Sequence, residues 1–362
     1  MSFALVATML SSLFAALMII FDRLMVTDCY DKKPSLAWFV SLSVGSVLGL
    51  IVTGLVWIGV YIANGINILD LAQTTWYPYG LWMLLAGVFT SQYLRHYFRI
   101  FIPEHDGAEL NETGVAMWIA SIPIFFLITV IVINKLGLNI GLFQHLENAT
   151  MSWTFVSGVV IATFGLIGFE RISGGNEGGS KKVYAKEISL MMFFTILYTL
   201  IIFSVMMSIE DTFGSVGVLA LSVLPFYWVG FSSGTLIFLK SSFRAEVKGN
   251  MLKMRYFVVP ILIAEIFGML LFLFEYLGLS EIDPTLVSLI ISTSVLLVYF
   301  MNYILKGIRL RLESRNLHEW TLFGYNISRD ALPRIVSRNV ALEITFIALT
   351  LIGLNICLQL VM

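Results

Sequence analysis

The sequence predicts an all-α membrane protein of ten transmembrane helices, arranged as two inverted repeats of five helices each. Three observations lead to this fold class. Ten segments are apolar enough to cross a bilayer, the basic residues fall almost entirely in alternate connections, and one glycine-rich break leaves five segments on either side. The composition agrees, since 58% of the residues are hydrophobic and 12% are charged, about half the charge of an average soluble domain.

The spans follow from the thickness of the bilayer core, about 30 Å, which an α-helix crosses with about 20 mostly apolar residues. Such segments occupy, in chain order, 3–26, 36–63, 79–100, 115–133, 153–169, 188–207, 216–239, 257–277, 284–305 and 340–360. None of the connections between them is long enough and polar enough to form a separate soluble domain. We therefore expect one membrane unit.

The basic residues predict the orientation of these spans. Of the 22 Lys and Arg residues, 21 (22 minus Lys135) lie at the end of an odd-numbered span or in the connection after it: Arg23, Lys32, Lys33, Arg95, Arg99, Arg171, Lys181, Lys182, Lys186, Lys240, Arg244, Lys248, Lys253, Arg255, Lys306, Arg309, Arg311, Arg315, Arg329, Arg334 and Arg338. Cytoplasmic connections carry an excess of Lys and Arg. Both termini are therefore predicted to lie outside, in a plasma membrane or a bacterial inner membrane.

The glycine-rich segment 173–186 is predicted to be a linker between the halves 1–172 and 187–362. An odd number of spans in each half gives the halves opposite orientations, which is the arrangement of an inverted-topology repeat. Within the second half, 306–339 is predicted to be a long basic inner loop. Its mixture of basic and apolar residues is typical of a segment that lies on an anionic lipid surface.

Ionisable and polar residues inside predicted spans are the first candidates for a substrate or coupling-ion site, because a charge at the bilayer centre costs at least about 2.5 kcal/mol. Glu265 lies near the middle of its span and is the foremost candidate. The alternative is a neutral glutamic acid that is hydrogen-bonded to a neighbouring helix and serves packing. Gln92 lies at a similar depth and is a second candidate for the same cavity.

Arg95 is a candidate for substrate binding and for an inner gate. Arg95 and Arg99 lie one helical turn apart, a spacing suited to clamping a carboxylate or phosphate. The alternative for both is snorkelling to lipid headgroups. Asp22 lies at the same depth as Arg95, so an ion pair between them could close the inner side, although Asp22 could equally be a solvated helix end.

Tyr198 and Trp118 are candidates for aromatic walls with polar handles, and simple packing is the alternative for both. Glu275 and Glu343 lie near the ends of their spans, and we interpret them as interfacial or paired with nearby basic residues.

Two GxxxG pairs, Gly45 with Gly49 and Gly230 with Gly234, occupy the second and seventh spans, which correspond in the two halves. Small residues at this spacing let helix backbones approach closely. Packing within one chain is the expected use, and a homodimer is the alternative.

The segment 11–24 is an apolar helix that ends in Asp22-Arg23, and Lys32-Lys33-Pro34-Ser35 follows it. The fourth span carries a central Pro123. These features, together with the run 264–290, resemble the EamA type of the drug/metabolite transporter superfamily. The resemblance implies alternating-access transport of a small metabolite through a cavity lined by the third, fourth, eighth and ninth spans. This chain departs from that pattern at Val295, where the family often has proline, and in having both termini outside.

The predicted function is therefore secondary transport of a small metabolite, as an exporter or exchanger. The alternatives are a membrane-embedded enzyme that acts on a lipid-linked substrate and a non-transporting membrane subunit. The chain has no Walker A sequence, its four histidines are scattered, and neither a metal nor another cofactor is expected. A net charge of −1 gives no reason to expect a nucleic-acid partner. The expected partners are a small-molecule substrate and the lipid bilayer.

Overall fold

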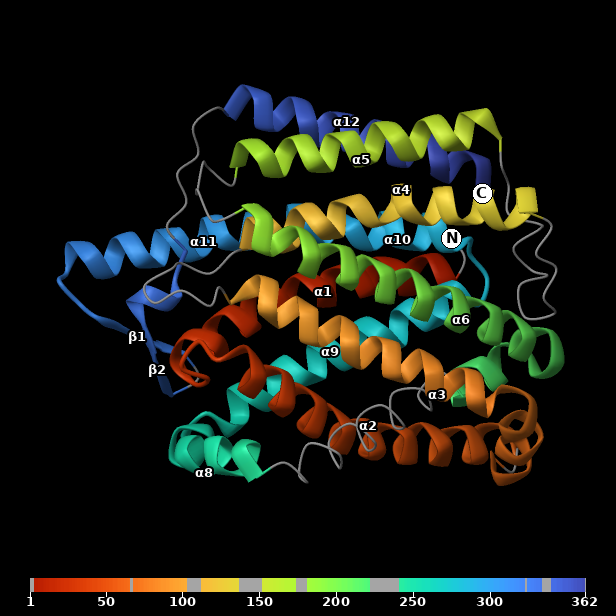
Figure 1. Cartoon of the computed structure of the whole chain (residues 1–362), viewed down its shortest axis with the longest axis horizontal. Helices are drawn as coiled ribbons and strands as arrows, with labels where there is room; N and C mark the ends of the chain where they lie inside the picture. The colour runs from red at the N-terminus through yellow and green to blue at the C-terminus, as the bar shows by residue number, and fades with distance from the viewer. Residues whose placement is uncertain are drawn as a thin grey trace.

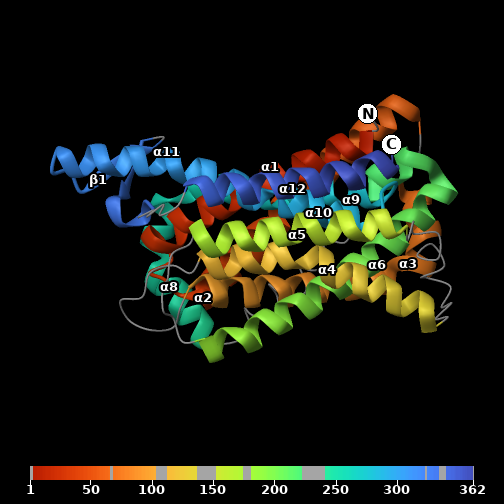
Figure 2. The same ribbon diagram turned by 90° about the horizontal axis from the view of Figure 1, so that it is seen from above.

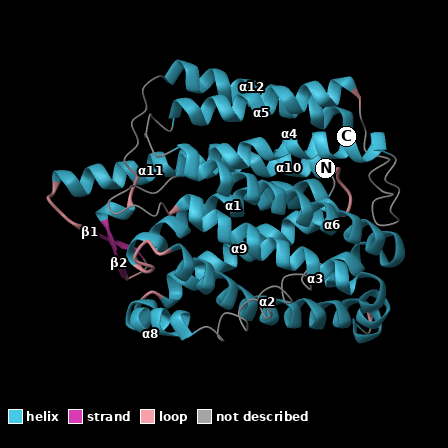
Figure 3. Cartoon of the chain, viewed as in Figure 1, coloured by secondary structure: helices cyan, strands magenta, loops and turns pink. Residues whose placement is uncertain are grey.

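The computed structural model describes residues 3–65, 68–102, 112–136, 152–173, 181–221, 241–322, 324–333 and 340–361. Most of these residues are helical (Figure 3). The helices, in chain order, are α1 (Phe3–Asp28), α2 (Pro34–Asn64), α3 (Ile68–Phe101), α4 (Glu112–Leu136), α5 (Trp153–Ser173), α6 (Lys181–Leu221), α8 (Ser241–Tyr256), α9 (Val258–Leu279), α10 (Pro284–Ser292), α11 (Ser294–Ser314) and α12 (Val340–Val361).

The long helices lie side by side along one common direction (Figures 1 and 2). α12 and α5 form one edge of this bundle and α2 lies at the opposite edge, with α1, α4, α9 and α10 between them (Figure 1). α1 begins and α12 ends at the same end of the bundle, whereas α11 projects beyond the other end (Figure 2). The three most extensive helix contacts join α5 to α12, α3 to α6 and α1 to α9.

Within the described residues, six helical segments are long and apolar enough to cross a membrane: Phe3–Asp28, Pro34–Ala63, Lys186–Ile209, Val258–Leu279, Pro284–Ser314 and Ala341–Gln359. Two shorter apolar helices, Ile119–Ile133 and Trp153–Phe169, accompany them. Large apolar side chains such as Leu55, Phe164 and Ile344 are more than half exposed, which suits contact with lipid and not with water. These features indicate a membrane-embedded protein. Of the predicted seventh span, 216–239, residues 222–239 lie outside the described residues.

The apolar segment Pro284–Ser314 is interrupted at Thr293, which separates α10 from α11. The Thr293 hydroxyl donates to the Ile290 carbonyl at 2.6 Å. A proline within α4 lies opposite this point. Pro123 inside α4 has no N–H, so the Ile119 carbonyl lacks its helical donor, and the Ser292 hydroxyl lies 2.7 Å from that oxygen. The irregular points of α4 and α10 therefore meet.

Glycines bring α5 and α12 into backbone contact. A Cβ atom added at Gly353 of α12 would lie 2.4 Å from the Ala162 nitrogen and 2.5 Å from the Gly158 oxygen. One added at Gly165 of α5 would lie 2.7 Å from the Thr350 nitrogen. Since real Cβ atoms do not approach backbone this closely, the interface requires glycine at these positions.

Much of the described part of the predicted inner loop 306–339 is regular structure. α11 continues as a helix to Ser314, and β1 (Glu319–Leu322) pairs with β2 (Tyr325–Ser328) in an antiparallel hairpin. Gly324 in the connection has φ +82°, in the left-handed region that short hairpin turns use. The described fold is thus almost all α, with one small two-stranded sheet.

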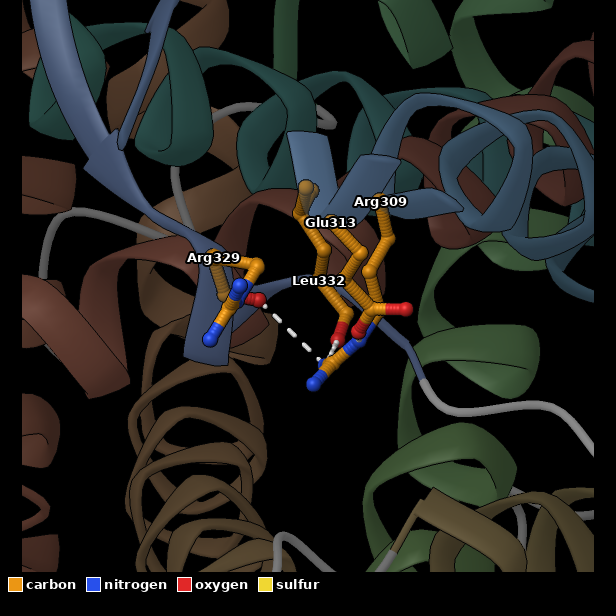
Figure 4. A network of polar contacts seen from close by, with 4 residues as sticks. All are labelled: Arg309, Glu313, Arg329 and Leu332. Carbon is orange, nitrogen blue, oxygen red and sulfur yellow. Dashed lines mark hydrogen bonds and ion pairs between the residues drawn. The ribbon is translucent and has the colours of Figure 1, made fainter. Parts of the chain in front are cut away.

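Polar contacts join this hairpin and the short 3-10 turn after it, Arg329–Ala331, to the helix ends. The Ser328 backbone N–H donates to Asp28 at the end of α1 at 2.9 Å. Arg309 of α11 donates to the carbonyls of Leu332 at 2.6 Å and Arg329 at 3.3 Å, and its Nε donates to Glu313 at 2.9 Å (Figure 4). The hairpin therefore links α1 to α11.

Candidate functional site

Two cavities lie on either side of the contact between α1 and α9, and Met18 and Phe272 line both. The first, which we name the lateral cavity, contains about 550 Å³ of space between atoms, and its walls are Met18, Asp22, Ser41, Leu42, Gly45, Thr90, Leu94, Phe98, Ala264, Glu265, Gly268, Met269 and Phe272. These residues come from α1, α2, α3 and α9.

The second, which we name the central cavity, contains about 560 Å³, and its walls are Ala15, Met18, Ile19, Tyr93, Tyr97, Ile119, Ile122, Thr195, Tyr198, Thr199, Leu271, Phe272, Glu275, Ser288, Ile291, Ser292 and Ser294. Its walls come from α1, α3, α4, α6, α9, α10 and the first residue of α11. Both irregular points described above, in α4 and between α10 and α11, border this cavity.

The lateral cavity contains two buried carboxyl groups, Asp22 from α1 and Glu265 from α9, which are 6% and 8% exposed. Each accepts a hydrogen bond from another helix. The Tyr97 hydroxyl donates to Asp22 Oδ2 at 2.9 Å, and the Ser41 hydroxyl donates to Glu265 Oε2 at 3.0 Å. Glu265 thus connects α9 to α2, and Asp22 connects α1 to α3.

The central cavity contains one carboxyl group, that of Glu275, which is 6% exposed. The Tyr198 hydroxyl lies 3.2 Å from Glu275 Oε1 and 3.4 Å from Oε2. Three aromatic rings beside it contact one another, with centroid distances of 6.0 Å for Tyr93 and Tyr198, 6.2 Å for Tyr198 and Phe272, and 6.5 Å for Tyr93 and Phe272. The acid therefore lies within an aromatic wall built from three helices.

Hydroxyl groups supply most of the other polar surface of the central cavity. Ser288 and Ser292 belong to α10, and Thr195 and Thr199 belong to α6. Ser294 is fully buried, and its hydroxyl has no hydrogen-bond partner in the part of the chain that the structure describes. A buried hydroxyl without a partner costs roughly 1–3 kcal/mol, so this group is available to a bound molecule.

Neither set of walls, as far as the structure describes them, includes a Lys, Arg or His side chain. Within the described ranges, no ion pair reaches Asp22, Glu265 or Glu275. Burial of a carboxylate without an opposite charge is strongly unfavourable. Each acid is therefore suited to holding a proton or to facing a cation.

The basic residues at the end of α3 have partners outside both cavities. The Arg95 guanidinium lies 5.7 Å from the centroid of the Trp38 ring. Arg99 pairs with Glu187 of α6 at 3.6 Å, and His96 also contacts Glu187 through Nδ1. Asp22 and Arg95, which we considered as a gate, thus have different partners in this conformation. Arg99 and His96 instead join α3 to α6.

The remaining predicted site residues divide as follows. Tyr198 lies in the central cavity, whereas Gln92 is half-buried and lines neither cavity. Gly45 lines the lateral cavity and Gly49 is buried, so this GxxxG ridge faces other helices of the same chain. The Trp118 side chain lies outside the described residues.

Gly230 and Gly234, the second predicted GxxxG pair, also lie outside the described residues.

The interpretation of Glu275 as interfacial or paired with basic residues was wrong, because the structure buries it beside Tyr198. Glu343 is likewise buried, and it accepts from the Tyr299 hydroxyl at 2.8 Å. The sequence signal for the burial of Glu275 was the composition of α9. Because this helix is apolar on every side, an acid on it is expected to face protein. Ten residues separate Glu265 from Glu275, which places them about 15 Å apart along the axis and about 80° apart around it, and hence in different cavities.

Comparison of the sequence with known protein families and with curated proteins gave no match. Among the residues described, no group of three or more His, Cys, Asp or Glu side chains is placed to hold a metal ion. The geometry of the cavities is therefore the basis for the functional assignment.

Proposed function

We propose that this chain is a secondary transporter that moves a small metabolite across a membrane by alternating access, as an exporter or exchanger. One observation carries the proposal. The interior of a bundle of apolar helices contains two neighbouring cavities with buried carboxyl groups that have no cationic partner among the described residues. Intramembrane acids in such positions mark substrate or ion pathways.

The helix contacts support the inverted repeat. If each span corresponds to the one five places later, α1 corresponds to α6, α3 to α9 and α5 to α12. Exchanging the halves then converts the α1–α9 contact into the α6–α3 contact and returns the α5–α12 contact to itself. These are the three most extensive contacts of the described chain. This relation favours ten crossings with a two-fold axis in the membrane plane.

The interrupted helices support a substrate site on that axis. α4 and the α10–α11 segment occupy the fourth and ninth places, which correspond in the two halves. Both are irregular, at Pro123 and Thr293, and both border the central cavity. Interrupted helices at corresponding positions are the best pointer to the binding site of a repeat-built transporter.

The orientation in the membrane and the family are also proposals, and both start from features of the sequence. The described residues at the α11 end of the bundle include Lys33 between α1 and α2, Arg99 in the last turn of α3 and Arg309 in α11, so the positive-inside rule assigns this end to the cytoplasm and both termini to the outside. The likeness to EamA-type transporters implied a cavity lined by the third, fourth, eighth and ninth spans. The central cavity has walls from α3, α4, α9 and α10, with α1 and α6 in addition, and this agreement supports the likeness.

Proteoliposomes containing the purified chain test the proposal. We expect saturable uptake of at least one class in a panel of labelled anionic, neutral and cationic metabolites, and stimulation by the same compound inside the vesicle. Glu275→Gln should lower this flux, whereas Glu343→Gln, at a buried acid outside both cavities, should leave it unchanged. Flux equal to that of empty vesicles for the whole panel would contradict transport. Turnover of a lipid-linked substrate in the same vesicles would favour the enzyme alternative.

A further inference from the structure

We infer that the central cavity binds a small organic cation, whose ammonium group lies between the Glu275 carboxylate and the faces of Tyr93, Tyr198 and Phe272. The inference rests on the proposed transport function and names its substrate class.

Charge is the first argument. Glu275 is the single acid among the described walls of the central cavity, and no basic side chain accompanies it there. Its hydrogen bond comes from the neutral hydroxyl of Tyr198. An anionic ligand would meet a like charge and no Lys or Arg, whereas an ammonium group would supply the opposite charge that the buried carboxylate lacks.

The aromatic wall is the second argument. Tyr93, Tyr198 and Phe272 come from α3, α6 and α9, and all three pairs of rings lie within 6.5 Å of each other. The negative faces of aromatic rings attract ammonium groups within about 6 Å, and groups of such rings are the usual binding sites for organic ammonium ions. A wall of this kind also excludes water, which strengthens the attraction between a cation and Glu275.

The hydroxyl group of Ser294 is the third argument. The Ser294 hydroxyl is fully buried and without a partner among the described residues, and it lines this cavity directly after the interruption at Thr293. A hydroxyl can accept a hydrogen bond from an ammonium N–H. A ligand with such donors would thus satisfy a wall hydroxyl that the described part of the protein leaves without a partner.

The lateral cavity shares the buried acids but not the aromatic wall. Like Glu275, Asp22 and Glu265 each accept a hydrogen bond from a neighbouring helix, through Tyr97 and Ser41, but Phe98 and Phe272 are the only aromatic residues among its described walls. We therefore assign the cation to Glu275 and not to Asp22 and Glu265 in the lateral cavity.

Three compounds of similar size and different charge test the assignment: 2-phenylethylammonium, 2-phenylethanol and 3-phenylpropanoate. Calorimetric titration of the full chain in nanodiscs should detect the cation and find at least about tenfold weaker binding of the alcohol and the anion. Glu275→Gln should weaken the binding of the cation at least about tenfold. The matched control Glu343→Gln, where a buried glutamate also accepts from a tyrosine, should leave its affinity unchanged.

A second variant keeps the test informative if Glu275→Gln fails to fold. Phe272→Leu removes a ring face while retaining an apolar side chain. It should therefore weaken the binding of the cation severalfold and leave the binding of the alcohol unchanged. Binding of the anion or the alcohol as tightly as the cation would overturn the inference, as would absence of binding by all three compounds. Full cation affinity in Glu275→Gln would overturn it equally.

Transport is judged separately, because titration in nanodiscs requires no gradient. A cation that binds in the Glu275-dependent manner but never crosses proteoliposomes leaves the site assignment intact and contradicts the transport proposal. Saturable flux of an anionic metabolite that 2-phenylethylammonium does not inhibit leaves transport intact and overturns the assignment of the cation.

Discussion

At the scale of single residues, α9 shows how position on one helix decides the role of a carboxyl group. Glu265 faces α2 and accepts from a serine, whereas Glu275 faces α6 and lies among aromatic rings. Both side chains are buried, and both belong to the same apolar helix. The difference lies in the neighbours: both acids join α9 to another helix, but only Glu275 does so beside three aromatic rings in mutual contact.

Asp283, in the connection before α10, gives a test by pH. Its side chain accepts from the Thr285 N–H at 2.8 Å, and burial raises the pKa of Asp283 above its ordinary value. The native state therefore holds this proton more tightly than the unfolded chain does. The stability that this group contributes is then present at low pH and is lost as the pH rises through the native pKa.

Asp283→Asn retains an oxygen that can cap the helix and removes the titration. We expect its melting temperature in detergent, relative to that of the unsubstituted protein, to increase from about pH 4 to about pH 8. Asp283→Ala, which loses the cap, should be less stable than Asp283→Asn by about 1 kcal/mol at both pH values. A difference between Asp283→Asn and the unsubstituted protein that does not change with pH would contradict this account.

The contact between Ser292 and Ile119 gives a second test at this scale. Ser292→Ala leaves the carbonyl that Pro123 deprives of its helical donor without a partner, and should cost about 1 kcal/mol in the free energy of unfolding. Pro123→Ala restores a backbone N–H to α4. A double-mutant cycle should therefore show a smaller cost of Ser292→Ala in that background. Equal costs in both backgrounds would mean that the serine does not serve the interrupted helix.

At the scale of elements, the α5–α12 interface depends on the absence of side chains. Gly353→Ala would force a Cβ against two backbone atoms of α5, and we expect a loss of about 1–3 kcal/mol. Gly59→Ala in α2 is the matched control, since no atom lies within 4 Å of its added Cβ. Thermal unfolding of the two variants should separate them clearly. A Gly353→Ala protein as stable as Gly59→Ala would show that the helices do not pack this closely.

Elements whose signal is local were predictable from the sequence. The predicted spans 3–26, 257–277 and 340–360 agree within two residues at each end with α1, α9 and α12, because an apolar run of bilayer length has few alternatives. The hairpin was not predictable, since strands of four residues carry too little alternation to register. It is held by contacts such as that between Asp28 and Ser328, which are 300 residues apart.

The candidate site divides in the same way. The burial of Glu265 followed from its depth in an apolar run, which any hydropathy argument can detect. The pairing of Glu275 with Tyr198 joins residues 77 positions apart on two helices, and no spacing rule within one helix specifies it. Sequence thus locates acids in the membrane, while only packing assigns each one to a cavity.

At the scale of the whole molecule, the two ends of the bundle differ in composition. The described end that carries the hairpin holds Arg309 and the contact of Arg99 with Glu187, whereas the opposite connection around Asp283 has no Lys or Arg between positions 256 and 305. An alternating-access cycle must open one end while the other is closed. The polar contacts of the hairpin therefore lie at the end that the proposed orientation assigns to the cytoplasm.

Parity of the crossings can be measured at two exposed positions in the connections after α1 and α9, Lys33 and Glu281. Seven predicted spans lie between them, so they should lie on opposite sides of the membrane. The natural cysteines, Cys29 and Cys357, are buried and should react little. In whole cells, a membrane-impermeant maleimide should label Glu281→Cys at once and Lys33→Cys only after permeabilisation.

The decisive span in this count is the seventh, because residues 222–239 lie outside the described structure. If that segment does not cross, only six crossings separate the two positions, and both variants react from the same side. The inverted repeat would then lose its second helix of the second half, and the correspondence of α3 with α9 would lose its basis. Labelling from opposite sides would support an odd count and, with it, the proposed two-fold relation between the halves.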